Sequence, residues 1–140
     1  MQFKIKPYGN EYNFDRQSDI IELIFSVTGL RVTVITGSSK FTNVYLDIHF
    51  KNINGFRLLD EGDLIAYWES GLFNVNHHIY EILSGGWSNG ESLESGMLSV
   101  SSSIGTKEWF IATTNRCLTV LSSSEPQINE FINSSISLNS

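Results

Sequence analysis

The chain has 140 residues, of which 41% are hydrophobic, and a formal net charge of −6 at pH 7. This is the length of one domain, which buries roughly two-thirds of the surface that its unfolded chain exposes. Its longest apolar segment, residues 20–30, contains Glu22 and Gly29 and falls short of the about 20 apolar residues that span a bilayer. The N-terminus lacks a signal-peptide pattern and Cys117 is the only cysteine, which together favour a cytoplasmic protein.

The negative charge is concentrated in the middle of the chain. Residues 60–108 contain one basic and eight acidic residues, whereas residues 1–59 contain seven basic and five acidic ones. Such a segment disfavours nucleic-acid binding and favours a basic partner. Ordinary solubility explains the same net charge, so both interpretations stay open at this point.

The first half of the chain is typical of an antiparallel sheet, because apolar and polar residues alternate along short segments. The segments expected to be strands are 3–7, 20–27, 31–36, 44–50 and 56–59. A two-turn helix ending at Phe25 is the alternative for the second segment, but its β-branched and aromatic side chains favour a strand.

Residues 60–69 are predicted to form a short amphipathic helix. Asp60 is suited to be its N-cap, and Asp63 adds negative charge to the first turn, where the helix dipole favours it. The apolar side of this helix would direct Trp68 towards the core, and Gly71 would end it.

The second half mixes strands, loops and one further helix. We expect strands at 78–83 and 97–100, a glycine-rich surface loop at 85–91, a hairpin pairing 108–113 with 117–121, and a helix at 125–133 that begins near Pro126. The prediction is therefore a single α+β domain over residues 1–133: a twisted, mainly antiparallel β-sheet of about six strands with two or three short helices. Residues 134–140 are expected to be a flexible C-terminal tail.

No pattern of catalytic or cofactor-binding residues is apparent in the sequence. His77 and His78 are adjacent, so their side chains point to opposite faces of a strand and do not share a metal. Cys117 lies in an apolar strand without a neighbouring base, and Gly85-Gly86 is followed by Trp87 instead of the Lys-Ser/Thr of a phosphate-binding loop. We expect no catalytic residue, no metal and no cofactor.

Three carboxylates close in sequence, Asp60, Glu61 and Asp63, leave one chemical alternative open. Paired carboxylates can serve as general acid and base, which would make the chain a small-ligand-binding or hydrolytic domain. Helix capping accounts for the same residues more simply.

Two segments of the chain resemble a known class of proteins. They are Gly-Phe-Arg-Leu-Leu-Asp-Glu-Gly-Asp-Leu at 55–64, followed by Tyr67 and Trp68, and Glu-Trp-Phe-Ile-Ala-Thr-Thr-Asn-Arg-Cys-Leu at 108–118. With the intervening residues 80–87, they are similar to small bacterial proteins that accompany polymorphic toxins, and the chain resembles immunity proteins of the contact-dependent growth inhibition type over about half of its length. The resemblance implies a cytoplasmic inhibitor that is not an enzyme. Such a protein binds one cognate toxin domain, often a basic nuclease, and blocks its active site.

The residues expected to bind the toxin combine charge with one aromatic anchor. They are Asp60, Glu61, Asp63, Glu69, Trp87, Glu91 and Glu94. The carboxylates would steer a basic toxin domain into contact, and Trp87 would supply buried contact area, unless its ring folds back over the sheet. Neither nucleic acid nor a membrane is expected as a partner, and the sequence leaves the oligomeric state open.

Overall fold

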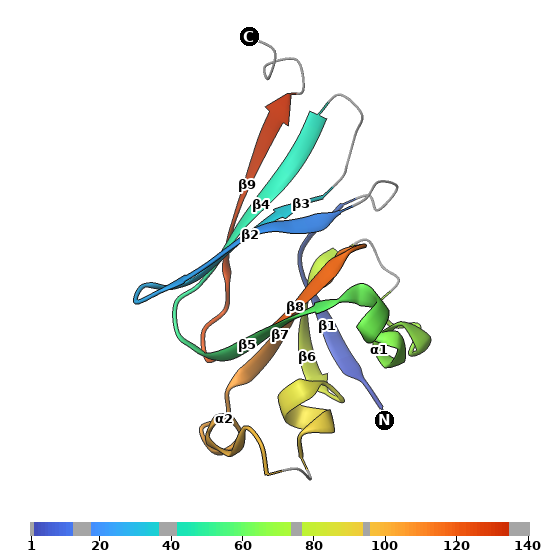
Figure 1. Ribbon diagram of the computed structural model, residues 1–140, viewed down its shortest axis with the longest axis vertical. Coiled ribbons are helices and arrows are strands. Elements are labelled where there is room, and N and C mark those ends of the chain that lie inside the picture. Colours follow the sequence, from blue (N-terminus) through green and yellow to red (C-terminus); the bar gives the residue numbers. More distant parts are fainter. Residues whose placement is uncertain (1, 13–17, 37–41, 74–76, 94–95, 135–140) are drawn as a thin grey trace.

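The computed structural model describes residues 2–12, 18–36, 42–73, 77–93 and 96–134 (Figure 1). Within these residues nine strands form two antiparallel sheets. The five-stranded sheet has the spatial order β1 (Lys4–Glu11), β6 (His77–Ser84), β7 (Lys107–Ile111), β8 (Arg116–Ser122) and β5 (Ile53–Asp60). The four-stranded sheet has the order β2 (Asp19–Ser26), β3 (Gly29–Ile35), β4 (Thr42–Phe50) and β9 (Gln127–Ser134).

Short helices connect the strands. They are the 3-10 helix η1 (Glu61–Asp63), the α-helices α1 (Ile65–Glu69) and α2 (Ser99–Ser103), and the π-helical turn η2 (Trp87–Glu91). Each described helix spans five residues or fewer, whereas crossing a lipid bilayer takes about 20.

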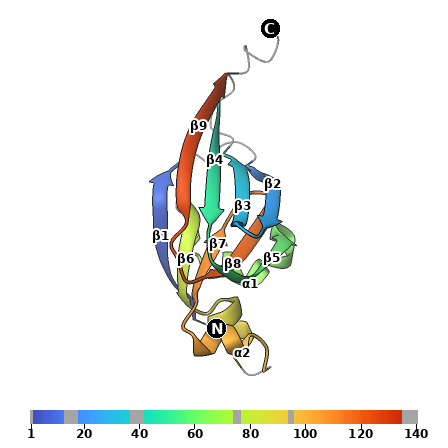
Figure 2. The same cartoon turned by 90° about the vertical axis from the view of Figure 1, so that its left-hand side faces the viewer.

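The main hydrophobic core lies between the two sheets. Figure 2 shows β9, β4, β3 and β2 side by side as one layer. Alternate residues of these strands point inwards and meet alternate residues of β6, β7 and β8. The buried side chains of this core are Ile20, Leu30, Val32, Val34, Leu46, Ile48, Phe50, Ile79, Trp109, Ile111, Leu118 and Val120.

A second core covers the outer face of the five-stranded sheet. Tyr67 of α1 packs on Phe110 of β7 with ring centroids 5.0 Å apart, and Phe73 packs on the same ring at 5.2 Å. Leu64 and Cys117 belong to this cluster as well. Apolar residues of β7 and β8 therefore point to both faces of the sheet, and α1 covers the outer one.

The structure confirms the predicted fold class and the hairpin of residues 108–121, which is β7 paired with β8. The strands are more numerous than expected and divide into two sheets. The predicted helix at 60–69 is interrupted, because Leu64 has φ −119° and ψ 40° and separates η1 from α1.

The predicted helix at 125–133 is wrong. This segment is β9, which pairs with β4 from Thr42↔Ser134 to His49↔Gln127. Pairing places Ile128 over the main core, so contacts with a distant strand outweigh a local pattern that also suits a helix.

The predicted strand at 97–100 is also wrong. Leu98 adopts a left-handed backbone conformation, with φ 59°, and α2 begins at the next residue. This conformation lies outside the extended region that regular strands occupy. The glycine-rich segment at 85–91 is more ordered than a surface loop, since most of it forms η2. Residues 135–140 of the predicted tail lie outside the described part of the chain.

Candidate functional site

The first acidic residues predicted to bind a toxin lie where β5 leads into η1. The Asp60 carboxylate accepts a hydrogen bond from the Gly62 amide at 2.8 Å and so acts as the N-cap. The Glu61 amide donates to the Asn115 carbonyl at 2.8 Å, and the Glu61 carbonyl accepts from the indole N–H of Trp68 at 2.6 Å. The backbone of this acidic turn is therefore held by the β7–β8 turn and by α1.

Four carboxylates and two apolar side chains share this end of the molecule. Asp60, Asp63 and Glu69 are exposed and Glu61 is half-buried, and no described lysine or arginine forms an ion pair with any of them. Ile65 is 60% exposed and lies one turn from Glu69 on the same side of α1. Leu72, which follows α1, is 42% exposed. We call Asp60, Glu61, Asp63, Ile65, Glu69 and Leu72 the α1 surface.

The carboxylates of the α1 surface affect the pKa of a buried thiol, that of Cys117. Burial raises the pKa of the Cys117 thiol to about 12, and the nearby carboxylates of Glu61 and Asp60 contribute to this rise. The thiol is therefore protonated at neutral pH and behaves as a small core residue.

Glu91, in contrast, forms an ion pair with another residue of the chain. Its carboxylate accepts two hydrogen bonds from the Arg57 guanidinium, at 2.6 and 2.7 Å. The same guanidinium lies 4.9 Å from the centre of the Trp87 ring and donates to the Tyr67 hydroxyl at 3.3 Å. The charge of Glu91 is thus compensated within the chain.

Trp87 is half-buried, and its backbone is fixed to the sheet by Glu108 of β7. The Glu108 carboxylate is buried and accepts hydrogen bonds from the Trp87 amide at 2.7 Å, the Ser88 amide at 2.8 Å and the Ser88 hydroxyl at 2.7 Å. These three donors stabilise a charge that burial would otherwise disfavour. The Trp87 ring lies against Arg57, so it does not stand free of the protein.

Glu108 was not among the residues predicted to form the site, although the sequence around it contains a signal of its structural role. It is an acidic residue directly before the apolar run Trp109-Phe110-Ile111 of β7, and Gly85-Gly86 lies in the turn that it contacts. A Cβ atom on Gly86 would lie 2.1 Å from the Glu108 Oε2 atom. Only glycine fits there, so the two residues define one structural unit. Glu94 lies outside the described residues.

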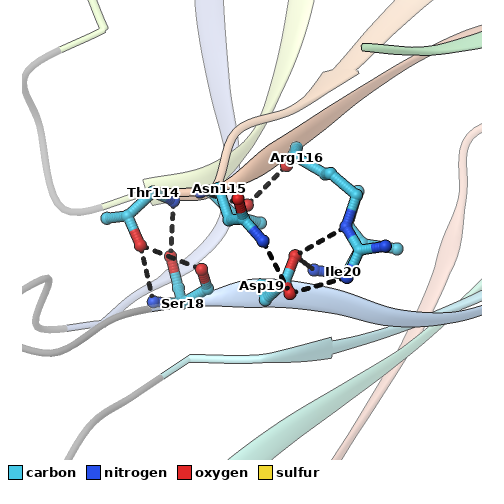
Figure 3. A network of polar contacts seen from close by, with 7 residues as sticks. Ser18, Asp19, Ile20, Thr114, Asn115 and Arg116 are labelled. Carbon is cyan, nitrogen blue, oxygen red and sulfur yellow. Dashed lines mark hydrogen bonds and ion pairs between the residues drawn. The ribbon is translucent and has the colours of Figure 1, made fainter. Parts of the chain in front are cut away.

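A polar network ties the two sheets together beside the α1 surface (Figure 3). The Thr114 hydroxyl donates to the Ser18 carbonyl and accepts from the Ser18 amide, both at 2.9 Å. Arg116 binds Asp19 with two hydrogen bonds, at 3.1 and 2.8 Å, and Asn115 donates to the same carboxylate. The bond from Arg116 is the main cause that lowers the pKa of Asp19 below its usual value. This network fixes the β7–β8 turn that holds Glu61.

The carboxylates considered for general acid–base chemistry, Asp60, Glu61 and Asp63, line none of the cavities that the structure defines from its described residues. Asp60 and Asp63 are exposed, and Asp60 caps η1. A cavity between the two sheets is lined by other residues, among them Tyr8, Tyr12 and His78. Within the part of the chain that the structure describes, no three His, Cys, Asp or Glu side chains are placed to hold a metal ion.

Comparison of the chain with protein-family models, with curated proteins and with solved structures finds no match. Its function is therefore inferred from its own residues.

Proposed function

We propose that the protein is an immunity protein that binds a basic bacterial toxin domain through the α1 surface and thereby blocks its active site. The observation that carries this proposal is the pairing pattern of the acidic residues. Asp19, Asp47 and Glu91 form ion pairs with arginines, whereas Asp60, Glu61, Asp63 and Glu69 have no described cationic partner and are concentrated within residues 60–69, next to the exposed Ile65.

The α1 surface has the composition of a small protein-binding site. Ile65 and Leu72 provide exposed apolar area, and the four carboxylates lie within ten residues of Ile65 in the chain. Apolar centres with polar rims are typical of protein interfaces. The charges would raise the association rate with a cationic partner, while the apolar side chains would slow dissociation.

The α1 surface is rigid, which favours binding. Tyr67 and Leu64 are buried in the outer core, and the indole of Trp68 is hydrogen-bonded to Glu61. A surface that is ordered before contact loses little conformational entropy on binding.

The rival function, a small-ligand-binding or hydrolytic domain, depends on Asp60, Glu61 and Asp63 acting as acid and base. The cap formed by Asp60 accounts for that carboxylate without a reaction. The immunity function needs no catalytic group, and we place its site of action in the cytoplasm, where the buried thiol of Cys117 would stay reduced.

Co-expression with the product of the gene next to the one that encodes this chain tests the proposal. We expect the two proteins to co-purify and the chain to protect growing cells from that product. A variant with Ile65→Ser and Leu72→Ser should lose both properties while its melting temperature stays close to that of the parent, because both side chains are exposed. The lack of a complex and of protection with the unmodified chain would refute the proposal.

A further inference from the structure

A cavity opens between the edges of the two sheets, away from the α1 surface. Its volume is about 130 Å³, and its walls come from β1, the residue Tyr12, β4, β6 and β9. The lining residues are Tyr8, Gly9, Asn10, Tyr12, Leu46, His78, Ile79, Ile128 and Glu130. An apolar cavity of about 150 Å³ holds a molecule the size of benzene, so this one suits a ligand of a few non-hydrogen atoms.

Aromatic and aliphatic side chains form most of the wall. Tyr8 packs edge-on against Trp109 with ring centroids 5.1 Å apart, and its hydroxyl donates to the Pro126 carbonyl at 3.3 Å. The Tyr12 hydroxyl donates to the Glu130 carboxylate. Both phenol groups are thus anchored at their outer ends, which leaves their rings as the part that can contact a ligand.

Glu130, whose side chain is exposed to solvent, supplies the charge at the opening of the cavity. It stands opposite Leu46 in the β4–β9 register, on the side of β9 that faces the main core. No lysine or arginine is among the described lining residues. Burial, followed by the bond to Glu130, raises the pKa of Tyr12 to about 12, so its hydroxyl keeps its proton at neutral pH.

His78 adds no positive charge at neutral pH. Its side chain is buried, and its ring lies edge-on to Tyr12 with centroids 5.9 Å apart. Burial lowers the pKa of His78 to about 4, with a smaller effect from His77. At pH 7 the cavity therefore contains a neutral imidazole, two neutral phenol rings and one carboxylate.

We infer that this cavity binds a small organic cation, such as a methylated ammonium group, with Glu130 as counter-ion and the rings of Tyr8 and Tyr12 against its methyl groups. Cations of this kind are recognised by aromatic faces together with a carboxylate, since the ring faces are electronegative and the methyl groups are apolar. An anion would be repelled by Glu130, and a neutral molecule of the same shape would gain only the apolar contacts.

Titration of the full chain with tetramethylammonium chloride, followed by NMR of the backbone amides, tests this inference. We expect saturable shifts centred on Leu46, Ile79 and Ile128, and none with sodium chloride at the same ionic strength. Tert-butanol, the neutral molecule of similar shape, should bind at least about tenfold more weakly, because it lacks the ion pair and the cation–π contact. Pivalate should not bind.

The variants Glu130→Gln and Tyr12→Leu should each weaken tetramethylammonium binding by about tenfold. Glu22→Gln, an exposed carboxylate on β2 at the other edge of the same sheet, is the matched control and should leave binding unchanged. Equal binding of tert-butanol and tetramethylammonium to the unmodified chain would overturn the inference. So would unchanged affinity in Glu130→Gln or the absence of saturable shifts, which would mean that the cavity holds only water.

Discussion

Arg57 of β5 and Glu91 of η2 form a bidentate ion pair, with Nη1 2.6 Å from Oε1 and Nη2 2.7 Å from Oε2. The pair fastens η2 to the edge strand of the five-stranded sheet and lies against the Trp87 ring. A residue that the charge distribution suggested for partner binding is therefore part of the protein's own structure. The carboxylates of the α1 surface differ from Glu91 in having no described cationic partner.

Glu91→Gln should lower stability and leave partner association unchanged. In a double-mutant cycle with Arg57→Met, we expect a coupling free energy of about 1 kcal/mol. Bidentate, partly buried ion pairs have larger coupling energies than ordinary surface pairs. Urea unfolding of the parent, the two single variants and the double variant measures it. A coupling energy near zero would show that the pair contributes nothing to the attachment of η2.

Gly86→Ala should destabilise the protein by about 2 kcal/mol or more, because the added Cβ would lie 2.1 Å from the Glu108 carboxylate and must displace it from its three donors. Gly55→Ala is the matched control, since its Cβ would meet nothing closer than 3.9 Å and neither glycine has a positive φ. We expect Gly55→Ala to be neutral or slightly stabilising. Thermal unfolding compares the two, and equal melting temperatures would argue against a fixed role for Glu108.

His78 should make stability depend on pH between about 6.5 and 4. The unfolded chain binds a proton at its ordinary pKa near 6.5, whereas burial holds the pKa in the folded protein at about 4. The contribution of His78 to the free energy of unfolding is therefore fully present above pH 6.5. It is lost as the pH is lowered towards 4, by up to about 3 kcal/mol. Tyr12, His77 and the carboxylate of Glu130 are the titratable groups near this ring.

The contribution of His78 is isolated by comparing unfolding free energies of the parent and His78→Gln at several pH values. The difference between them should shrink as the pH falls from 7 to 4.5. A constant difference over this pH range would contradict the burial of a neutral imidazole.

Thr114→Val should remove hydrogen bonds that link the two sheets and so lower the free energy of unfolding. The change keeps the shape of the side chain but leaves the buried amide and carbonyl of Ser18 without this partner. We expect a loss of about 1–3 kcal/mol, with faster hydrogen exchange at the Ser18 amide. Thr106→Val is the control, because the buried Thr106 hydroxyl has no hydrogen-bond partner among the described residues, and it should be neutral or stabilising.

Local patterns in the sequence predicted those elements whose partner is a neighbour along the chain. The β7–β8 hairpin is the clearest example, because both strands are apolar and a four-residue turn joins them. The β9 segment was mistaken for a helix, because Ile128, Phe131 and Ile132 have a spacing that suits a helix as well as a strand. What decides its conformation is pairing with β4, which lies about 80 residues earlier.

The candidate site could be predicted only in part for the same reason. The cap formed by Asp60 depends on residues next to it, and the sequence predicted it correctly. Arg57 and Glu91 are 34 residues apart, and Glu108 finds its donors about 20 residues away, so nothing in the local sequence separates these acids from the free ones. The cavity between the sheets likewise joins residues from both ends of the chain.

The association rate with the neighbouring gene's product that co-purifies with the chain, measured by stopped flow at low and high salt, tests most directly whether the α1 surface binds a basic partner. The variant combines Asp60→Asn, Asp63→Asn and Glu69→Gln, and asparagine at position 60 keeps the cap on η1. The control combines Glu11→Gln, Glu22→Gln and Glu125→Gln, three exposed carboxylates elsewhere on the molecule. We predict that the first variant associates about tenfold more slowly at low salt, with a flatter salt dependence and an unchanged melting temperature, while the control behaves like the parent. An unchanged association rate in the folded α1 variant, or equal slowing in the control, would contradict binding through the α1 surface.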